Sequence, residues 1–246
     1  MKTIDLNELD VVGELGKGSY GKIYKVLLED KEYAFKHFND RLTLVDDEFI
    51  DKIKEMDRFN LKNSYLPKTI VNKNNNFCGY LTKVSNSKNM SWLVESEDTN
   101  RKIVLLKTAK NALKEIHDNN IIHGDIHEGN FLIDRSVLID FDNCHFDDYY
   151  TDTIFFSDDA CRYLRTYDFT KELDIYLFNL MTFRLLNKMS SNDAYFALRE
   201  KKYGIFDTRE AIDICDSLVL ENEIFNSDYL IDTINLREIK KLNKKF

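Results

Sequence analysis

The hydrophobic pattern of this 246-residue chain changes once, from the period of strands to the period of helices. From Gly21 to about residue 84, apolar residues alternate in short runs separated by polar turns, as in KIYKVLLEDKEYAFKHF. From residue 101 onwards, apolar residues recur at intervals of three and four, which is typical of helices. Strands first and helices afterwards predict an α+β fold with two lobes.

The same pattern predicts the individual elements. In the first lobe we expect a hairpin from Gly21 that turns at residues 29–31, a helix over 44–60, and short strands around 66–72 and 77–84. In the second lobe we expect helices over 101–118, 173–188 and parts of 190–236, a strand-like block at 121–143, and an irregular acidic segment at 141–172. The chain is then a single two-lobed domain, with lobes over about 1–84 and 100–246 and a hinge over about 85–99.

Composition limits the classes of function. The net charge of −8 argues against a broad nucleic-acid-binding face. The four cysteines form no C-x-x-C pair, which argues against a disulfide scaffold and a zinc site. No window approaches 18 consecutive apolar residues, and the N-terminal sequence has no apolar stretch long enough for a signal peptide. We therefore expect a cytoplasmic protein with no membrane span and no nucleic-acid partner.

Glycine is scarce, with eight residues where average usage gives about 17. Gly16, Gly18 and Gly21 form the pattern G-x-G-x-x-G. A dinucleotide-binding fold or a P-loop would need a helix directly after the glycines, whereas this sequence continues as a strand. Two interpretations stay open: a glycine loop between two strands that covers nucleotide phosphates, and an ordinary glycine-rich hairpin.

A lysine follows on the next predicted strand. Lys36 stands 20 residues after Gly16, at a distance from which its ammonium can reach phosphates beneath the loop. A lysine buried there needs a counter-ion. In the helix predicted over 44–60 we prefer Glu55, because it leaves Phe59 one turn further on facing the core, and Glu48 is the alternative.

The strongest signal is HGDIHEGNFLID at 123–134, followed by IDFD at 139–142. Phosphoryl transfer needs a carboxylate to orient the attacking hydroxyl and two or more oxygen ligands for Mg²⁺. Asp125, Asn130 and Asp140 supply these groups, and each stands beside a short apolar segment that can hold it rigidly.

Together these motifs resemble those of the protein-kinase-like fold, in the order of that family, from about Val11 to about Asn187. The resemblance implies a small lobe of antiparallel strands plus one helix, a mostly helical second lobe, and the cofactors ATP and Mg²⁺. It implies the catalytic residues Asp125, Lys36 and Asn130, and the metal ligands Asn130 and Asp140. The nucleotide-binding residues it implies are Gly16, Lys17, Gly18, Ser19, Tyr20, Gly21, Ile23, Ala34, Lys36 and Glu55. Asp174 resembles the aspartate that braces the catalytic loop from behind.

The sequence departs from the family pattern in the motifs themselves. Gly124 stands where the family has an arginine, and His127 stands where serine/threonine kinases usually carry lysine. No A-P-E follows, and YLRTYDF at 163–169 lies in roughly its place. Asp142 replaces the last glycine of D-F-G, and we expect it to restrict the backbone because aspartate lacks glycine's freedom of φ.

The resemblance implies an ATP-dependent phosphotransferase. We expect a serine/threonine protein kinase whose substrate is a protein or peptide, the chain itself included. The loop HGDIHEGN also resembles that of aminoglycoside and choline phosphotransferases, so a small-molecule acceptor is the alternative. The changes at Gly124 and Asp142 motivate a second alternative, a nucleotide-binding scaffold without catalysis.

Overall fold

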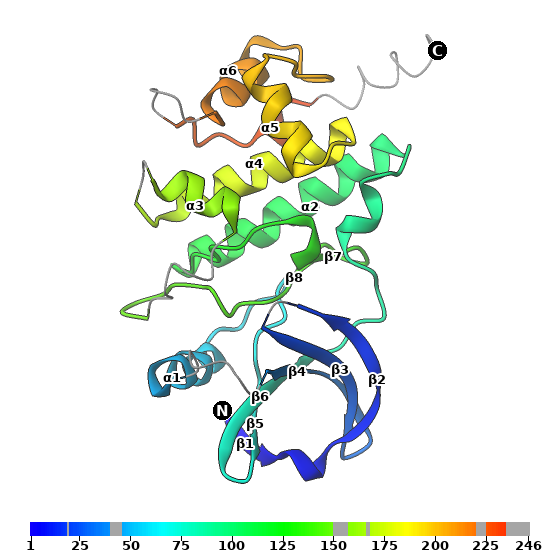
Figure 1. Cartoon of the computed structure of the whole chain (residues 1–246), viewed down its shortest axis with the longest axis vertical. Coiled ribbons are helices and arrows are strands. Elements are labelled where there is room, and N and C mark those ends of the chain that lie inside the picture. The colour runs from blue at the N-terminus through cyan, green and yellow to red at the C-terminus, as the bar shows by residue number, and fades with distance from the viewer. Residues whose placement is uncertain (19, 40–45, 150–156, 166–167, 220–224, 235–246) are drawn as a thin grey trace.

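The computed structural model describes residues 1–18, 20–39, 46–149, 157–165, 168–219 and 225–234. Figure 1 shows a lobe built around a β-sheet, formed by the N-terminal part of the chain, and a helical lobe formed by the rest. The predicted α+β architecture with two lobes is confirmed. Among the described residues, no helix has both the length and the apolar character needed to cross a membrane.

The small lobe contains a six-stranded sheet in the order β1-β5-β6-β4-β3-β2. Its strands are β1 (Lys2–Asp5), β2 (Asp10–Lys17), β3 (Gly21–Leu28), β4 (Lys31–Phe38), β5 (Thr69–Lys73) and β6 (Asn76–Lys83). All neighbouring strands are antiparallel except β1, which pairs with β5 in parallel. The sequence pattern did not predict β1, because four residues are too few to show a period.

The predicted hairpin is confirmed as β3 and β4. Its turn consists of Glu29 and Asp30, whose φ angles of 52° and 61° both lie in the left-handed region. Two consecutive residues in this region form a two-residue turn whose twist matches that of the flanking strands. The turn fixes the register of β3 against β4 from Gly21, which pairs with Phe38, to Leu28, which pairs with Lys31.

The helix beside the sheet is shorter than predicted. Helix α1 covers Asp47–Glu55 and continues as a 3₁₀ turn over Met56–Arg58, while positions 44 and 45 of the predicted helix lie outside the described residues. Asp46 caps its first turn by accepting a hydrogen bond from the backbone N–H of Phe49 at 2.8 Å. Figure 1 shows α1 beside the sheet, on the side of the lobe where β1 and β5 lie.

The large lobe is organised around α2 (Thr99–Asp118) and α4 (Lys171–Asn187), which pack against each other. The other helices are α3 (Asp158–Leu164), α5 (Ser191–Arg199) and α6 (Arg209–Ser217), and a short ribbon of β7 (Phe131–Leu132) and β8 (Val137–Leu138) follows α2. Helix α3 lies within the segment predicted to be irregular. It is only seven residues long and begins at Ser157, whose hydroxyl accepts a hydrogen bond from Ala160 N.

Side chains alternate between the two faces of the sheet, so the apolar residues of the small lobe divide between two hydrophobic clusters. Phe35 on β4 packs in the smaller cluster with Val26 and Leu81. Lys36 and Phe38 point to the opposite face, where Phe38 joins the large cluster that continues into the helical lobe. The face that carries Lys36 is therefore the face turned toward the second lobe.

Candidate active site

The sheet face turned toward the helical lobe carries three of the predicted nucleotide-binding side chains. The register of β3 against β4 places Ile23 directly opposite Lys36, and Ala34 lies two residues before Lys36 on the same face. Lys36 is buried, with 7% of its surface exposed. The structure thus brings Ile23, Ala34 and Lys36 together, as expected of one binding surface.

The glycine loop joins β2 to β3, so the strand–loop–strand geometry favoured by the sequence is confirmed. Gly18 donates a backbone hydrogen bond to the carbonyl of Gly21 at 2.9 Å. A Cβ atom at Gly16 or Gly18 would meet no other atom within 4 Å, whereas at Gly21 it would lie 2.1 Å from the carbonyl oxygen of His37. Packing therefore requires glycine at position 21 but not at positions 16 and 18.

The remaining predicted residues of this loop lie at its tip. Lys17 is exposed, and Tyr20 is partly buried against the large hydrophobic cluster. The backbone carbonyl of Tyr20 accepts a hydrogen bond from Asn39 N at 2.9 Å, which ties the end of the loop to the end of β4. Ser19 lies outside the described residues.

The predicted ion pair between Lys36 and Glu55 is wrong. The ammonium of Lys36 forms salt bridges with Asp140 and with Asp142, the latter at 2.5 Å from Oδ2. The Glu55 side chain is about half exposed and lies 3.9 Å from Arg58, one turn further along. In the part of the chain that the structure describes, Glu48 is not paired with Lys36 either. The pKa of Lys36 is raised, because the two carboxylates outweigh the effect of its burial.

Helix α1 turns a lysine, not a glutamate, toward the site. Lys52 is 1% exposed and donates hydrogen bonds from Nζ to the backbone carbonyls of Asp142 at 2.6 Å and Cys144 at 3.4 Å. Burial lowers the pKa of Lys52. The prediction for Glu55 is wrong because of the rotation of α1 about its own axis, which places Lys52 and Ile53 on the buried face of the helix.

Asp142 does not adopt the backbone conformation expected of a glycine position. The residue of this segment in the left-handed region is Asp140, with φ of 65°, whereas Asp142 has no positive φ. Asp142 therefore keeps to the φ range open to any residue, in agreement with the restriction expected of aspartate at this position. Its carboxylate is buried and accepts a hydrogen bond from the hydroxyl of Tyr80 at 2.6 Å, in addition to its salt bridge with Lys36.

The catalytic-loop motif gathers its polar groups around Asp125. Asn130 donates from Nδ2 to the backbone carbonyl of Asp125 at 2.9 Å and to its carboxylate at 3.2 Å. His127 Nε2 lies 3.6 Å from the same carboxylate, while His127 Nδ1 accepts a hydrogen bond from Gly129 N. Burial acts to raise the pKa of Asp125, but His127, His123 and Asn130 together lower it further than burial raises it.

The loop is anchored from below by Asp174 of α4, which is completely buried. Its carboxylate accepts backbone hydrogen bonds from His123 and Gly124, both at 2.8 Å, and contacts His117 Nε2 at 2.9 Å. Gly124 has φ of 76°, a conformation that favours glycine. The bracing role that the resemblance implied for Asp174 is confirmed.

Two further contacts join the catalytic loop to its surroundings. The ring of His123 packs edge-on against Phe141, with centroids 4.9 Å apart, and both side chains are buried. Arg184 of α4 forms salt bridges with Glu128 of the loop and, at 3.1 Å, with Asp159 of α3. No local pattern in the sequence points to Arg184, because its partners are 56 and 25 residues away.

The donor set fits Mg²⁺ bound together with phosphates. Asp140 is about one third exposed, and the side chain of Asn130 makes both of its described hydrogen bonds through Nδ2, so the amide oxygen is the atom that a cation would contact. Within the described ranges, no group of three or more His, Cys, Asp or Glu side chains is gathered as a metal cluster. Mg²⁺ usually takes only one or two carboxylates from the protein and keeps phosphate and water as other ligands.

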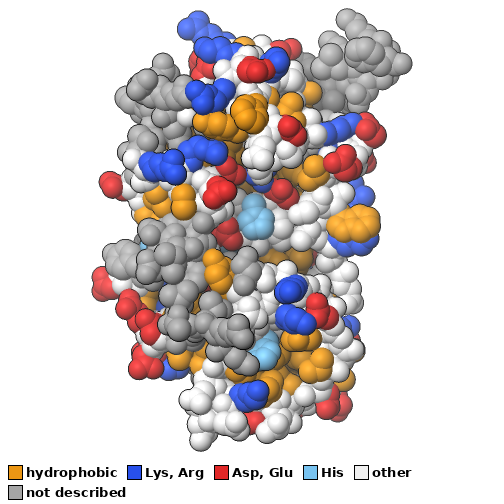
Figure 2. Space-filling view, in the orientation of Figure 1, with side chains coloured by type: hydrophobic (Ala, Val, Ile, Leu, Met, Phe, Trp, Pro, Cys, Tyr) orange, Lys and Arg blue, Asp and Glu red, His pale blue; other side chains and the backbone are white. Residues whose placement is uncertain are grey.

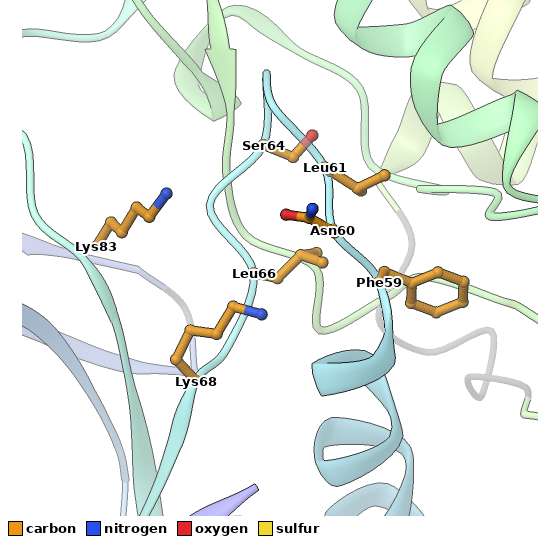
Figure 3. Close-up of a pocket in the computed structure, with 7 residues that line it drawn as sticks. All are labelled: Phe59, Asn60, Leu61, Ser64, Leu66, Lys68 and Lys83. Carbon is orange, nitrogen blue, oxygen red and sulfur yellow. The ribbon is translucent and has the colours of Figure 1, made fainter.

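The surface between the lobes is also rich in acidic side chains. Figure 2 shows acidic side chains and a histidine exposed midway along this face of the molecule. A separate small hollow lies along the segment that follows α1 and is lined by Phe59, Asn60, Leu61, Ser64, Leu66, Lys68 and Lys83 (Figure 3). It contains none of the predicted site residues. Lys68 contacts Asp57 at 3.5 Å, and Lys83 lies over the ring of Tyr65.

Comparison with known proteins shows similarity to protein kinases. The sequence profile of the protein kinase domain matches residues 9–191. A probable leucine-rich repeat receptor-like protein kinase of Arabidopsis thaliana is 22% identical over 270 positions, which cover 94% of this chain. The alignment covers 22% of the relative, so the chain spans about a fifth of that protein's length.

Proposed function

Because the chain belongs to the protein kinase domain family, we propose that it is an ATP-dependent kinase that phosphorylates serine or threonine hydroxyls of a protein or peptide. The observation that carries the proposal is the convergence of Lys36 and Asp140 from different lobes, beside a catalytic loop anchored by Asp174. ATP supplies the phosphoryl group, and Mg²⁺ neutralises its charge when bound.

The residues have distinct roles in this proposal. The backbone of the loop from Gly16 to Gly21 covers the phosphates, and Lys36 binds the α- and β-phosphates beneath it. Asp140 and Asn130 hold Mg²⁺. Ile23 and Ala34, which share the sheet face with Lys36, pack against the nucleotide.

Asp125 orients the acceptor hydroxyl. Its pKa is lowered, so its carboxylate is ionised at neutral pH and can accept the hydrogen bond of the acceptor. The complete glycine loop favours a protein acceptor, as it does in the resemblance to protein kinases. The four cysteines are free, which is compatible with a reducing compartment, and we propose a cytoplasmic location.

Transfer of label from γ-³²P-ATP tests the proposal. Wild type and Asp125→Asn are incubated with Mg²⁺ and with three classes of acceptor: the protein itself, a serine- and threonine-containing peptide library, and small alcohols including aminoglycosides. We expect wild type to label protein or peptide, and Asp125→Asn to lose that labelling. Equal labelling by both proteins would overturn the role of Asp125.

The pattern of acceptors separates the alternatives. Labelling of small alcohols without labelling of protein would replace the protein acceptor by a small molecule. ATP binding without transfer to any acceptor would identify a nucleotide-binding scaffold.

A further inference from the structure

The register of the sheet brings Lys36 and Tyr80 together. Lys36 on β4 pairs directly with Tyr80 on β6, so the two side chains stand side by side on the face turned toward the large lobe. Both are buried, with 7% and 3% of their surfaces exposed. A buried ammonium and a buried hydroxyl each need a polar partner, because burial without one is costly.

One carboxylate serves both side chains. Asp142 accepts the Tyr80 hydroxyl at Oδ1, 2.6 Å away, and forms the salt bridge with Lys36 at Oδ2, 2.5 Å away. Its backbone carbonyl accepts the hydrogen bond from Lys52. Asp142 is thereby held from β4, from β6 and from α1, and it is 6% exposed.

Among the described residues, no carboxylate of α1 forms a salt bridge with Lys36. Kinase catalysis requires that the strand lysine be held by an acidic partner, and in the family pattern that partner comes from the helix. Here the buried face of α1 presents Lys52, and its last acid, Glu55, lies in solvent beside Arg58. The buried side chain of the helix is therefore a cation, where the family pattern has an anion. An acidic residue stands instead at position 142, where the family has glycine.

We infer that Asp142, fixed by Tyr80, is the positioning residue of Lys36, and that it takes the place of the helix glutamate. Asp140 is committed to Mg²⁺ under the proposed function, so Asp142 is the carboxylate that stays with the lysine. The lysine and its partner then belong to the sheet and to the metal-binding segment, and the phosphate site assembles without a carboxylate from α1. This inference rests on the proposed function and adds a residue to it.

Steady-state kinetics with ATP as the varied substrate test the inference. We expect Asp142→Asn to lower kcat/KM for ATP by about 10²-fold, because a displaced lysine no longer meets the phosphates, while KM for the acceptor stays unchanged. Tyr80→Phe removes only the hydroxyl and should give a smaller loss of the same kind. Glu55→Gln should match wild type, and the exposed Asp51→Asn is the control for a neutral change on α1. A loss in Glu55→Gln with none in Asp142→Asn would overturn the inference.

A second measurement does not depend on activity. Unfolding by urea gives a double-mutant cycle between Lys36→Met and Asp142→Asn, and another between Lys36→Met and Glu55→Gln. We expect strong coupling in the first cycle and none in the second. If Asp142→Asn does not fold, a cycle between Lys36→Met and Tyr80→Phe replaces the first cycle. Absence of coupling in that cycle counts against the inference. Wild type that shows the coupling but transfers no phosphoryl group would contradict the proposed function and leave the ion-pair assignment standing.

Discussion

The two loops that meet between the lobes are held in opposite ways. The catalytic loop at 123–130 is fixed from within, because the buried carboxylate of Asp174 binds two of its backbone N–H groups. The glycine loop at 16–21 is held by the sheet at Gly21, while Gly16 and Gly18 have open space where a side chain would stand. One loop is therefore positioned by the protein, and the other has room for a ligand to approach its backbone.

This difference shows that the glycines of one motif can be required for different reasons. Gly21 and Gly124 are required by the fold, the first by a close backbone contact and the second by its φ of 76°. Gly16 and Gly18 have no such cause in the protein, so contact with phosphate is the reason we propose for them. Substitutions in the two loops should then separate stability from nucleotide binding.

The largest effect is expected from Asp174→Ala. Removal of the carboxylate leaves two buried N–H groups and His117 without their acceptor, and we expect a loss of about 3–5 kcal/mol in the free energy of unfolding. Urea unfolding followed by circular dichroism measures it. Glu172→Ala, an exposed position on the same helix, is the matched control and should change stability by less than about 0.5 kcal/mol. Equal midpoints for the two variants would show that Asp174 does not anchor the loop.

A smaller effect is expected within the glycine loop. Gly21→Ala places a Cβ atom against the His37 carbonyl and should cost about 2–3 kcal/mol by overpacking. Gly18→Ala should leave the unfolding midpoint close to that of wild type and weaken ATP binding, because its side chain meets no protein atom and enters open space that we propose the phosphates approach. Thermal unfolding and a titration with a fluorescent ATP analogue measure the two properties. Loss of stability in Gly18→Ala, or tight ATP binding by it, would remove the distinction.

The smallest effect is expected from the titration of His127. Burial acts to lower the pKa of His127, but Asp125 raises it above its ordinary value of 6.5. A raised pKa means that the folded state binds the proton more tightly, so the contribution to stability is complete below pH 6.5 and is lost as pH rises through the raised value. The unfolding free energy of wild type should therefore exceed that of His127→Gln by a margin that shrinks as pH rises above 6.5.

Urea unfolding at several pH values measures this margin. The opposite trend, a margin that grows with pH, would contradict the assignment. In an Asp125→Asn background the margin should no longer shrink as pH rises, because the carboxylate that raises the pKa of His127 is gone while the burial that lowers it remains.

Much of the fold could be predicted from local pattern. Alternation predicted the hairpin of β3 and β4, the three-to-four spacing of apolar residues predicted α2, and a long apolar run predicted α4 as a buried helix, because these signals need only neighbouring residues. Strand β1 and helix α3 were not predicted. Both are short, and β1 is held by pairing with β5, some 65 residues away along the chain.

The candidate site divides in the same way. The sequence by itself determined which chemical groups are present and in what order, since Lys36, Asp125, Asn130 and Asp140 were identified from motif spacing alone. Only the tertiary structure decided which carboxylate meets Lys36. That choice depends on the register of β4 against β6 and on the rotation of α1, which turns Lys52 inward and leaves Glu55 in solvent. Side chains from four segments meet there, and no local period along the chain records such a meeting.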